Sequence, residues 1–562
     1  MIISALFKWH KILIIFFLII FFAIILLNSA PFWSGKIFAE RTLEQVPSYW
    51  NDIANYLNTD QSIDRIIVTP AVYASVYNWG TPASSVARAL VKKSIIEVEK
   101  ADYGYKRFNR LLVNSVKNPT IFSFILKIGN IKYIIQRNDI DASYYENTDK
   151  NEQMKKYLND NEKLEYINDF GKLSLYRVKE AYIMPRLYIP NNINYIQGDL
   201  ETNIESFSFD NEKLKSYLTE SGANFISNNK NLDSNNDYLL DKLNNIILPI
   251  GLNNPHIVEL KKAIELTKIN GNTPEITQLQ TKLDIYSNAV AIDDFHLIPP
   301  IAGKYNIYLR PESITDNHRY IRIIIDDNEL PFIKQDETNH TNGWLYLNQV
   351  ELTKADHLIK IFIGDNKLQM INPGDIVFTM QDIKPEIKTP TIEYRQINPT
   401  KYIINVHSAP ESFPLILSES FYDSWKMYVR PELSSQGTGK FIGESNHGTI
   451  QNDNLDSTPF YDNFFAKPVF DKKHFMINGY ANAWWIDLPE LEKQGLIKKN
   501  NDGTYDFSVT IEFTPQKYFY IGLFISCLTF IGCIAYLIWD FLKRRKEQLL
   551  LANKTRINYN KS

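Results

Sequence analysis

The stretch YFYIGLFISCLTFIGCIAYLIWDF, residues 518–541, is followed almost at once by the basic cluster KRRK at 543–546. A mainly apolar run of about 24 residues, rising about 1.5 Å per helical residue, is long enough to cross a hydrocarbon core of about 30 Å. Aromatic residues near the ends of a span favour the membrane–water interface, and a basic cluster beside it marks the cytoplasmic side. The sequence therefore predicts a transmembrane helix over 518–541 and a basic cytoplasmic tail over 542–562.

A second apolar stretch, Ile12–Leu27, lies near the amino terminus and is preceded by Lys8 and Lys11. The basic flank, and the poor cleavage site at Asn28–Pro31, favour an uncleaved span over a cleaved signal peptide. We therefore expect residues 1–33 to form a cytoplasmic stub and a transmembrane helix. The alternative, a cleaved signal, leaves the chain anchored at its C-terminus. Either way, the predicted location is a bacterial cytoplasmic membrane with a large extracytoplasmic region; in the two-pass case both termini are cytoplasmic.

Composition excludes several classes of function. The 562 residues are 44% hydrophobic and have a net charge of −3, with Lys+Arg 61 against Asp+Glu 64. Such a chain can build packed cores, and without a basic surplus nucleic acid is not expected as a partner. The two cysteines, Cys527 and Cys533, both lie in the predicted C-terminal span. The outer region therefore has no disulfide and no cysteine-based metal site, and we expect neither a cofactor nor a metal.

Residues 34–190 alternate between strand-like and helix-like patterns. Three runs predict strands: Arg65–Thr69, Lys132–Gln136 and Lys172–Val178. Helical spacing occurs in three segments: Glu44–Leu57, Phe108–Ile128 with a break at Pro119, and Gln153–Asn159. Strands separated by helices predict an extracytoplasmic α/β domain with a βαβ-like sheet.

Residues 191–290 predict a connecting region. Residues 191–236 are polar and rich in Asn, Ser and Asp, which is typical of loops with short helices. Asn254–Thr267 and Thr273–Val290 both show helical spacing and are separated by a turn at Asn270–Asn272. We interpret this region as a helical spacer.

Two β-rich modules follow, over 291–384 and 385–517, so the predicted fold class is multi-domain α+β. The first predicts a β-sandwich with four strands: Tyr305–Leu309, Tyr320–Ile325, Leu345–Leu352 and His357–Ile363. Its Asp326-Asp327 pair predicts a hairpin turn rather than a metal site. The second is predicted to be sandwich-like, with paired strands at Tyr402–His407 and Phe413–Ser418 and a last strand at Thr504–Phe513.

Four motifs occur in an order that matches a known family: VPSYW at 46–50, RIIVTP at 65–70, YNWG at 77–80 and IGNIKYIIQRNDID at 128–141. This region resembles the extracytoplasmic portion of arabinofuranosyltransferase-like, multispanning (GT-C type) bacterial glycosyltransferases. HFMINGYANAWWID at 474–487 resembles the last domain of that family, and 291–384 resembles jelly-roll, galactose-binding-like carbohydrate-binding modules. The resemblance implies a lipid-linked sugar as donor, catalytic carboxylates in the multispanning core, and outer domains that bind glycan.

Glycan-binding surfaces combine aromatic faces with polar side chains that hydrogen-bond hydroxyl groups. On this basis the candidates in the first β module are Trp344, His318, Asn342 and Arg310. The candidates in the second β module (385–517), which we call the membrane-proximal domain, are Trp425, Tyr480, Trp484 and Trp485. Packing inside the fold is the competing interpretation for these tryptophans and for Tyr480.

No catalytic residue is assigned. Glu40, Glu44 and Asp52 follow the first predicted span, where a carboxylate could act as a general base, but two spans do not make a multispanning core. Motifs of the GxSxG, HExxH and P-loop types are absent. Our leading hypothesis is a membrane-anchored, glycan-binding accessory part of a split lipid-linked-sugar glycosyltransferase system in cell-envelope polysaccharide assembly, docked on a separate multispanning core chain. The alternatives are a glycosyltransferase that itself uses a polyprenyl-phosphate sugar, and a non-enzymatic scaffold of the chain-length-regulator type.

Overall fold

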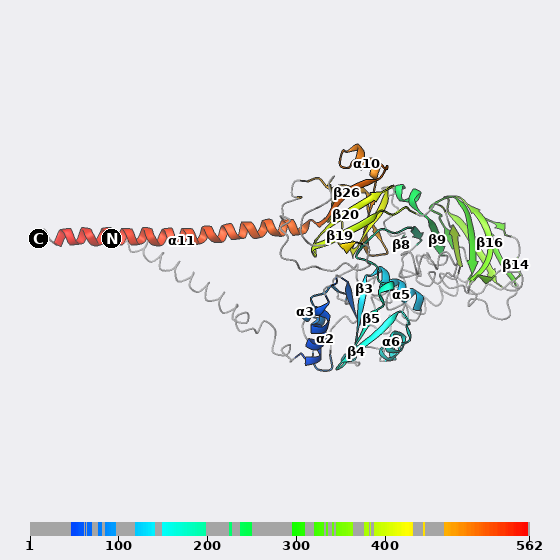
Figure 1. Cartoon of the computed structure of the whole chain (residues 1–562), viewed down its shortest axis with the longest axis horizontal. Helices are drawn as coiled ribbons and strands as arrows, with labels where there is room; N and C mark the ends of the chain where they lie inside the picture. Colours follow the sequence, from blue (N-terminus) through cyan, green and yellow to red (C-terminus); the bar gives the residue numbers. More distant parts are fainter. Residues whose placement is uncertain are drawn as a thin grey trace, which may run out of the picture.

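The computed structural model describes residues 46–60, 62, 64–69, 77–80, 85–96, 119–140, 149–197, 224–227, 237–249, 295–309, 320–330, 333–334, 340–341, 344–363, 376–380, 383, 387–430, 442–443, 463 and 466–559. They form an α/β domain, a β module of two sheets, a membrane-proximal β domain and a long C-terminal helix, α11 (Figure 1). The mixed α+β character predicted from the sequence is confirmed.

The α/β domain is built on a five-stranded sheet of order β2-β1-β3-β5-β4. Its strands are β1 (Arg65–Thr69), β2 (Ile95–Ile96), β3 (Ile131–Arg137), β4 (Leu164–Phe170) and β5 (Leu173–Val178). Strands β2, β1 and β3 are parallel, while β5 is antiparallel to β3 and to β4. Its helices are α2 (Ser48–Thr59), α3 (Val86–Leu90), α5 (Pro119–Ile128) and α6 (Asp149–Asp160). The predicted strands are confirmed, and α5 begins at the proline that was expected to break the longer pattern.

Helix α2 forms because its apolar residues recur at helical spacing and cover one side of this sheet. The buried residues of α2 are Trp50, Ile53, Ala54 and Leu57. They share a hydrophobic cluster with Ile66 and Val68 of β1 and Ile135 of β3. The start of α2 is thereby held beside the two central parallel strands.

The next module contains two sheets, of orders β10-β17-β12-β13, with β14 paired to β12, and β15-β16-β11-β18-β9-β7-β8. The strands of the first are β10 (Phe295–Leu297), β12 (Tyr320–Ile325), β13 (Asn328–Glu329), β14 (Ile333–Lys334) and β17 (His357–Ile363). Those of the second are β7 (Ile193–Ile196), β8 (Asn224–Ser227), β9 (Asn245–Pro249), β11 (Gly303–Leu309), β15 (His340–Thr341), β16 (Trp344–Leu352) and β18 (Ile376–Met380). Both sheets contribute to one hydrophobic cluster, and the jelly-roll assignment stays a prediction.

The connecting region differs from the helical spacer expected over 191–290. Its described residues include strands β7, β8 and β9, and β9 pairs with β18, so they extend a sheet of the β module. The apolar runs INYI and NIILP are too short for a helical period to show, and burial on the sheet accounts for them. The predicted helices Asn254–Thr267 and Thr273–Val290 lie outside the described residues.

The membrane-proximal domain has two sheets, of orders β22-β26-β20-β19-β23 and β24-β25-β21-β6. The first contains β19 (Thr391–Asn398), β20 (Lys401–Ala409), β22 (Trp425–Arg430), β23 (Ile442–Gly443) and β26 (Tyr505–Phe513). The second contains β6 (Leu187–Tyr188), β21 (Phe413–Ser420), β24 (His474–Ile477) and β25 (Ala481–Ile486). The remaining short elements are α10 (Leu488–Lys493) and the 3-10 helices η3 (Glu180–Tyr182), η5 (Asp237–Lys242) and η8 (Asp471–Lys473).

Strands β20 and β21 are not paired, so the pairing expected from the sequence is wrong. Each strand belongs to a different sheet. Strand β20 has a register shift between Val406 and Ala409, with a left-handed φ of 53° at Ser408, and leaves the first sheet after Ala409, which still pairs with Tyr505 of β26. Asn478 and Gly479 lie in the turn between the antiparallel strands β24 and β25, with φ of 55° and 71°, as in tight hairpin turns.

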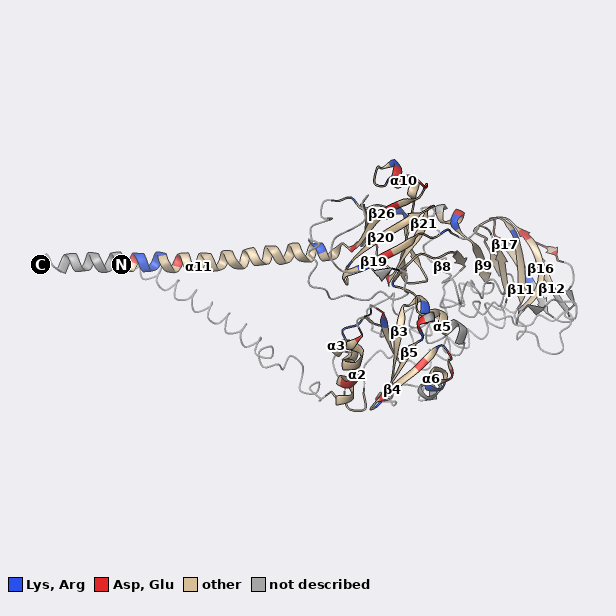
Figure 2. Ribbon diagram, viewed as in Figure 1, with Lys and Arg blue, Asp and Glu red and all other residues tan. Residues whose placement is uncertain are grey.

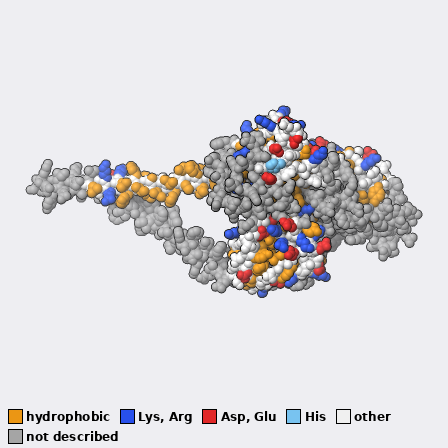
Figure 3. All heavy atoms as spheres, in the orientation of Figure 1, with side chains coloured by type: hydrophobic (Ala, Val, Ile, Leu, Met, Phe, Trp, Pro, Cys, Tyr) orange, Lys and Arg blue, Asp and Glu red, His pale blue; other side chains and the backbone are white. Residues whose placement is uncertain are grey.

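Helix α11 (Pro515–Tyr559) leaves this domain as a single continuous helix. Its segment Pro515–Leu549 contains an 18-residue window with a mean hydropathy of 2.4 and is long and apolar enough to cross a membrane. In Figure 3 a long apolar surface on α11 precedes a group of basic side chains, whose positions along the helix are blue in Figure 2. The C-terminal span predicted at 518–541 falls within α11, and the predicted N-terminal span lies outside the described residues.

Candidate functional site

The order β2-β1-β3 places a topological switch point between β1 and β3, because the chain leaves β1 towards β2 on one side and β3 lies on the other. In open α/β sheets ligands bind outside the carboxyl ends of the strands at such a point. A ligand site is therefore expected among the residues that follow β1 and β3.

Asp139 lies just after β3 at this edge and is fully buried. Its Oδ2 accepts three hydrogen bonds, from Tyr49 Oη at 2.9 Å, Trp50 Nε1 at 3.0 Å and Trp79 Nε1 at 3.0 Å. The carbonyl oxygen of Asp139 also accepts a bond from the backbone N–H of Asn78 at 2.7 Å. One carboxylate thus joins the start of α2, the turn at 77–80 and the end of β3.

The aromatic rings around this carboxylate pack on one another. The ring of Tyr77 stacks on Trp79 with centroids 4.6 Å apart and meets Trp50 edge-on at 6.0 Å. The guanidinium of Arg137 lies 5.8 Å from the centroid of the Tyr77 ring, within the range of a cation–π contact. We call Tyr49, Trp50, Tyr77, Trp79 and Asp139 the Asp139 cluster.

In this cluster the neutral side chains of Tyr49, Trp50 and Trp79 donate hydrogen bonds to one acceptor, the carboxylate of Asp139. Burial, and then the hydrogen bond to Asp139, raise the pKa of Tyr49 far above its usual value, so its hydroxyl stays protonated. Among the residues that the structure describes, no group donates to the second carboxylate oxygen, Oδ1. Because a carboxylate accepts hydrogen bonds through both oxygens, the cluster retains an acceptor at its centre.

The rim of the Asp139 cluster is accessible. Tyr49 and Trp79 are partly exposed, and Asn78 and Asn138 are exposed beside them. Indole and amide groups side by side are suited to a polyhydroxylated ligand, since aromatic rings offer apolar faces and amides both donate and accept hydrogen bonds. The buried carboxylate is suited to positioning these groups rather than to reacting with a ligand.

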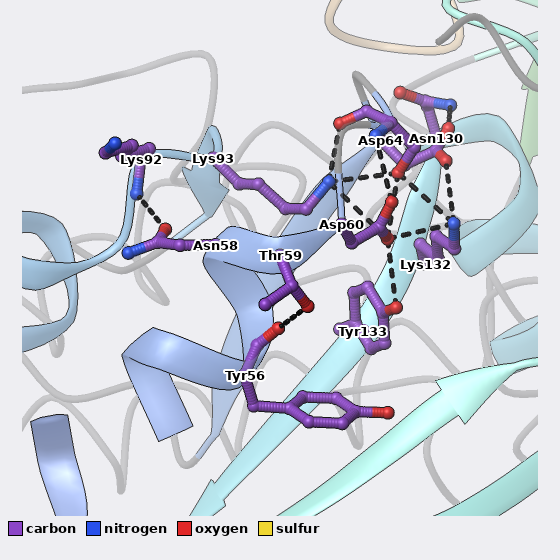
Figure 4. Close-up of polar contacts among 11 residues, drawn as sticks. Tyr56, Asn58, Thr59, Asp60, Asp64, Lys92, Lys93, Asn130, Lys132 and Tyr133 are labelled. Atoms are coloured by element: carbon purple, nitrogen blue, oxygen red, sulfur yellow. Dashed lines mark hydrogen bonds and ion pairs between the residues drawn. The ribbon is translucent and has the colours of Figure 1, made fainter. Parts of the chain in front are cut away.

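A second polar cluster lies at the opposite, amino-terminal edge of the same strands and is centred on Asp60 (Figure 4). Its Oδ2 is 2.9 Å from Lys132 Nζ and 3.5 Å from Lys93 Nζ, and it accepts bonds from Tyr133 Oη at 2.9 Å and Ser62 Oγ at 3.0 Å. The Asp60 carboxylate therefore ties the segment before β1 to β3 and to the segment before β2.

In the Asp60 cluster, the effect of burial on the carboxylate is opposed by the groups that bond to it. Burial alone would raise the pKa of Asp60, but the hydrogen bond from the Ser62 N–H and the nearby Lys132 and Lys93 outweigh it and lower that pKa strongly. Burial lowers the pKa of Lys93. Neighbouring Asp64 accepts a bond from Asn130 Nδ2 at 2.8 Å. Since these groups bond mainly to one another, the cluster is a structural clamp on the sheet.

The glycan-binding candidates of the membrane-proximal domain are buried. The exposed fractions are 6% for Trp425, 1% for Tyr480, 0% for Trp484 and 5% for Trp485. Tyr480 donates a 2.8 Å hydrogen bond to the carbonyl oxygen of Ile128 at the end of α5, and Trp484 stacks on His474 at 4.3 Å. These contacts give Tyr480 and Trp484 a packing role, and glycan binding by the four residues stays a prediction.

The structure does not place the other sequence candidates in a site. Trp344 begins β16, but its side chain is outside the described part of the chain, as are Arg310, His318 and Asn342. Asp52 is exposed on α2, whereas Glu40 and Glu44 lie outside the described residues.

The acidic pair in the first β module forms a turn, as predicted. Asp326 and Asp327 have φ of 50° and 63° and join β12 to β13. The Oδ2 atom of Asp326 is 2.5 Å from His357 Nδ1, which holds the turn against β17. The described residues contain no group of three side chains that could hold a metal ion.

Sequence reasoning did not assign the Asp139 cluster to a site, although its members lie inside the motifs quoted for the resemblance. The available signal was an acidic residue directly after a predicted buried strand, with tryptophans in two other motifs. Nothing in the local pattern indicates that these motifs meet, because Tyr49 and Trp79 are 90 and 60 positions from Asp139.

Residues 8–192 match the family model described as alpha-(1→3)-arabinofuranosyltransferase, N-terminal GT-C domain. This region is therefore similar to that family, which confirms the resemblance inferred from the motifs. All members of the Asp139 cluster lie within the matched residues. No curated protein matches the chain.

Solved structures give further matches. The cryo-EM structure of arabinofuranosyltransferase AftD from Mycobacteria is 11% identical, with 87% of this chain and 49% of that chain covered and a TM-score of 0.29. A structure of a mutant of the same enzyme is 12% identical, with 73% and 42% covered and a TM-score of 0.29. The C-terminal globular domain of an oligosaccharyltransferase from Archaeoglobus fulgidus is 9% identical, with 24% and 99% covered and a TM-score of 0.16. The chain spans about half the length of the arabinofuranosyltransferase structures.

Proposed function

We propose that this chain is the membrane-anchored, extracytoplasmic glycan-binding part of a glycosyltransferase system that uses lipid-linked sugars in cell-envelope polysaccharide assembly. It docks on a multispanning catalytic chain and presents bound glycan to it. The family match favours a glycan that contains arabinofuranose.

One observation carries this proposal: three separate segments meet at the buried Asp139 carboxylate, at the switch point between β1 and β3. Binding sites in open α/β sheets occur at this position. The segments also carry the motifs of the family resemblance, and they lie within the region that matches the family model.

In this proposal the ligand contacts are made at the rim. The partly exposed ring of Trp79 stacks on a sugar, and the exposed amides of Asn78 and Asn138 bond to its hydroxyl groups. Asp139 is a positioning residue, because it fixes Trp79 through the indole N–H and Asn78 through the backbone.

The described outer residues do not favour the chain-length-regulator alternative. Such scaffolds depend on long outer helices, whereas the described helices before α11 have at most 12 residues, in α2 and α6. No observation favours independent catalysis by this chain.

The binding site can be tested with the full-length protein in detergent and synthetic arabinofuranosyl oligosaccharides, using calorimetry. Trp79→Ala is expected to weaken binding at least about tenfold, which corresponds to about 1.4 kcal/mol. Asn78→Ala combined with Asn138→Ala is expected to weaken it to a similar degree. Asp52→Ala, an exposed change on α2, is the matched control and should leave binding unchanged. Equal affinities for all variants would contradict the assignment of the rim.

The partner can be tested by mild solubilisation of native membranes, capture of this chain and identification of what is retained. We expect a multispanning glycosyltransferase chain to co-purify, and sugar transfer from a polyprenyl-phosphate donor to need both chains. Transfer by the purified chain alone would instead establish it as an enzyme. Recovery of neither glycan nor a multispanning chain would overturn the proposal.

A further inference from the structure

Helix α11 is built into the membrane-proximal domain at its first turn. Strand β26 ends at Phe513, and α11 begins at Pro515. Lys517 Nζ, in this first turn, lies 3.1 Å from Glu512 Oε2 and donates to Tyr428 Oη at 3.2 Å and to the carbonyl oxygen of Asn463 at 3.0 Å. Lys517 is buried, so these bonds fix the start of α11 to the strands beside it.

The loop at 421–424 is attached to the same point. The backbone N–H of Thr514 donates to the carbonyl oxygen of Ser424 at 2.9 Å, and that of Trp425 donates to Tyr422 at 3.0 Å. The ring of Tyr422 meets Phe513 edge-on, with centroids 6.2 Å apart. The loop therefore occupies a defined position beside the point where α11 leaves the domain.

Large apolar side chains are exposed at this end of the domain. The exposed fraction is 53% for Tyr422, 69% for Tyr518 and 62% for Phe519. Tyr518 is four residues beyond Thr514, or about 6 Å along a helix axis. The apolar surface of α11, within Pro515–Leu549, continues away from the domain (Figure 3). The Tyr422 ring is thus close to the level where the apolar segment begins.

We propose that the loop 421–424 rests on the outer headgroup layer of the bilayer that α11 crosses, with the Tyr422 ring at the membrane–water interface. A bilayer that surrounds the apolar surface of α11 ends beside this loop, because the loop is joined to the start of that helix. Tyrosine is favoured at that level because its ring is apolar and its hydroxyl is polar. The exposed neighbour Asp423 is acidic, so the contact is with interfacial and upper acyl regions rather than with negatively charged headgroups.

The inference is independent of glycan binding and is tested with a fluorescent label. In a full-length background with Cys527→Ser and Cys533→Ser, Tyr422→Cys is labelled with an environment-sensitive probe. The protein is then reconstituted in phosphatidylcholine vesicles that contain shallow spin-labelled lipid. Tyr166→Cys is the matched control, because Tyr166 is also an exposed tyrosine, 49% accessible, but lies on β4 of the α/β domain.

We expect the probe at position 422 to be quenched at least about twofold more than the probe at 166 and to be shielded from aqueous iodide. Replacing a third of the phosphatidylcholine by phosphatidylglycerol should not increase the quenching. Equal iodide access at both positions in vesicles would overturn the proposal. Shielding at 422 in native membranes but not in pure lipid vesicles would assign the surface to a protein partner, and would overturn it as well.

Discussion

Arg65 Nη2 on β1 lies 2.9 Å from Glu419 Oε2 on β21, so an ion pair between a fully buried arginine and a largely buried glutamate joins the α/β domain to the membrane-proximal domain. Arg186 Nη1 is 3.0 Å from the other carboxylate oxygen, and Tyr402 Oη donates to that oxygen at 3.2 Å. Burial alone would raise the pKa of Glu419, but the two arginines outweigh it and keep that pKa below its usual value. Glu419 is therefore the charge that allows two guanidinium groups to lie together in this interface.

Glu419→Gln is expected to destabilise the protein by about 3–5 kcal/mol, because it leaves two buried arginines without their counter-charge. Urea unfolding of the full chain in detergent, followed by tryptophan fluorescence, measures the effect. Glu165→Gln is the control: its pair with Arg177 is 2.6 Å long, but both side chains are more than 40% exposed. Loss of such a surface pair should cost at most about 1 kcal/mol. Similar costs for the two variants would show that the interface does not depend on Glu419.

Asp139→Asn is expected to lower stability by about 1–3 kcal/mol, because an amide cannot satisfy the three donors that converge on the carboxylate. We also expect weaker glycan binding, since Trp79 and the 77–80 turn lose their anchor. Thermal unfolding and calorimetric binding of the same preparations separate the two effects. Asp52→Asn, on the exposed face of α2, should change neither by more than about 0.5 kcal/mol.

Gly171→Ala is expected to disturb the Asp139 cluster by displacing the side chain of Tyr49. Gly171 has a φ of +57°, and a Cβ atom there would lie 2.8 Å from the side chain of Tyr49. The left-handed conformation alone costs an alanine about 1 kcal/mol, and displacement of the Tyr49 ring adds to this.

Gly495→Ala is the matched control for this experiment, because its φ is +70° and a Cβ atom would meet nothing within 4 Å. The difference between the two variants in unfolding free energy therefore isolates the contact with Tyr49. We expect only the change at 171 to weaken glycan binding. Equal effects of the two substitutions would mean that Gly171 matters for its backbone conformation alone.

His474 is expected to make stability depend on pH. Burial lowers the pKa of His474 to about 4, although the bond to Asn482 opposes this. The unfolded chain, with an ordinary histidine pKa of about 6.5, then binds more protons than the folded chain in this interval. Stability should therefore fall as the pH is lowered from about 6.5 to about 4, by up to about 3 kcal/mol.

Unfolding measured across this pH range tests the role of His474. His474→Gln should flatten the profile in this window. A profile that keeps its slope in His474→Gln would assign the dependence to other groups.

The elements of the α/β domain followed from local pattern. The run RIIVT forms β1 with the predicted bounds, since a short buried β-branched run leaves few alternatives. The helical period of α2 was equally clear, because its buried face repeats over several turns. Where the pattern was long or strongly apolar, it was sufficient to predict the helix or strand.

The sheet that each short strand joins could not be predicted from the sequence pattern in the same way. Strand β6 has two residues and β7 has four, so neither shows a period that would indicate which sheet it joins. The Asp139 cluster depends on contacts between segments that are far apart in the chain, and local patterns carry no information on such contacts. Burial of Tyr480 and Trp484 was equally hidden, because aromatic residues in a hairpin suit a binding surface and a core equally well.

The bonds of Lys517 have a mechanical consequence. Because these bonds fix the first turn of α11 to the membrane-proximal domain as one rigid unit, a tilt of the helix in the bilayer also tilts that domain. Transmembrane helices are tilted by about 20° on average, and the angle responds to the thickness of the bilayer. Because the Arg65–Glu419 ion pair joins the α/β domain to the membrane-proximal domain, a thinner or thicker membrane would also move the Asp139 cluster towards or away from the lipid surface. Lipid composition would in this way set the height of the Asp139 cluster above the membrane.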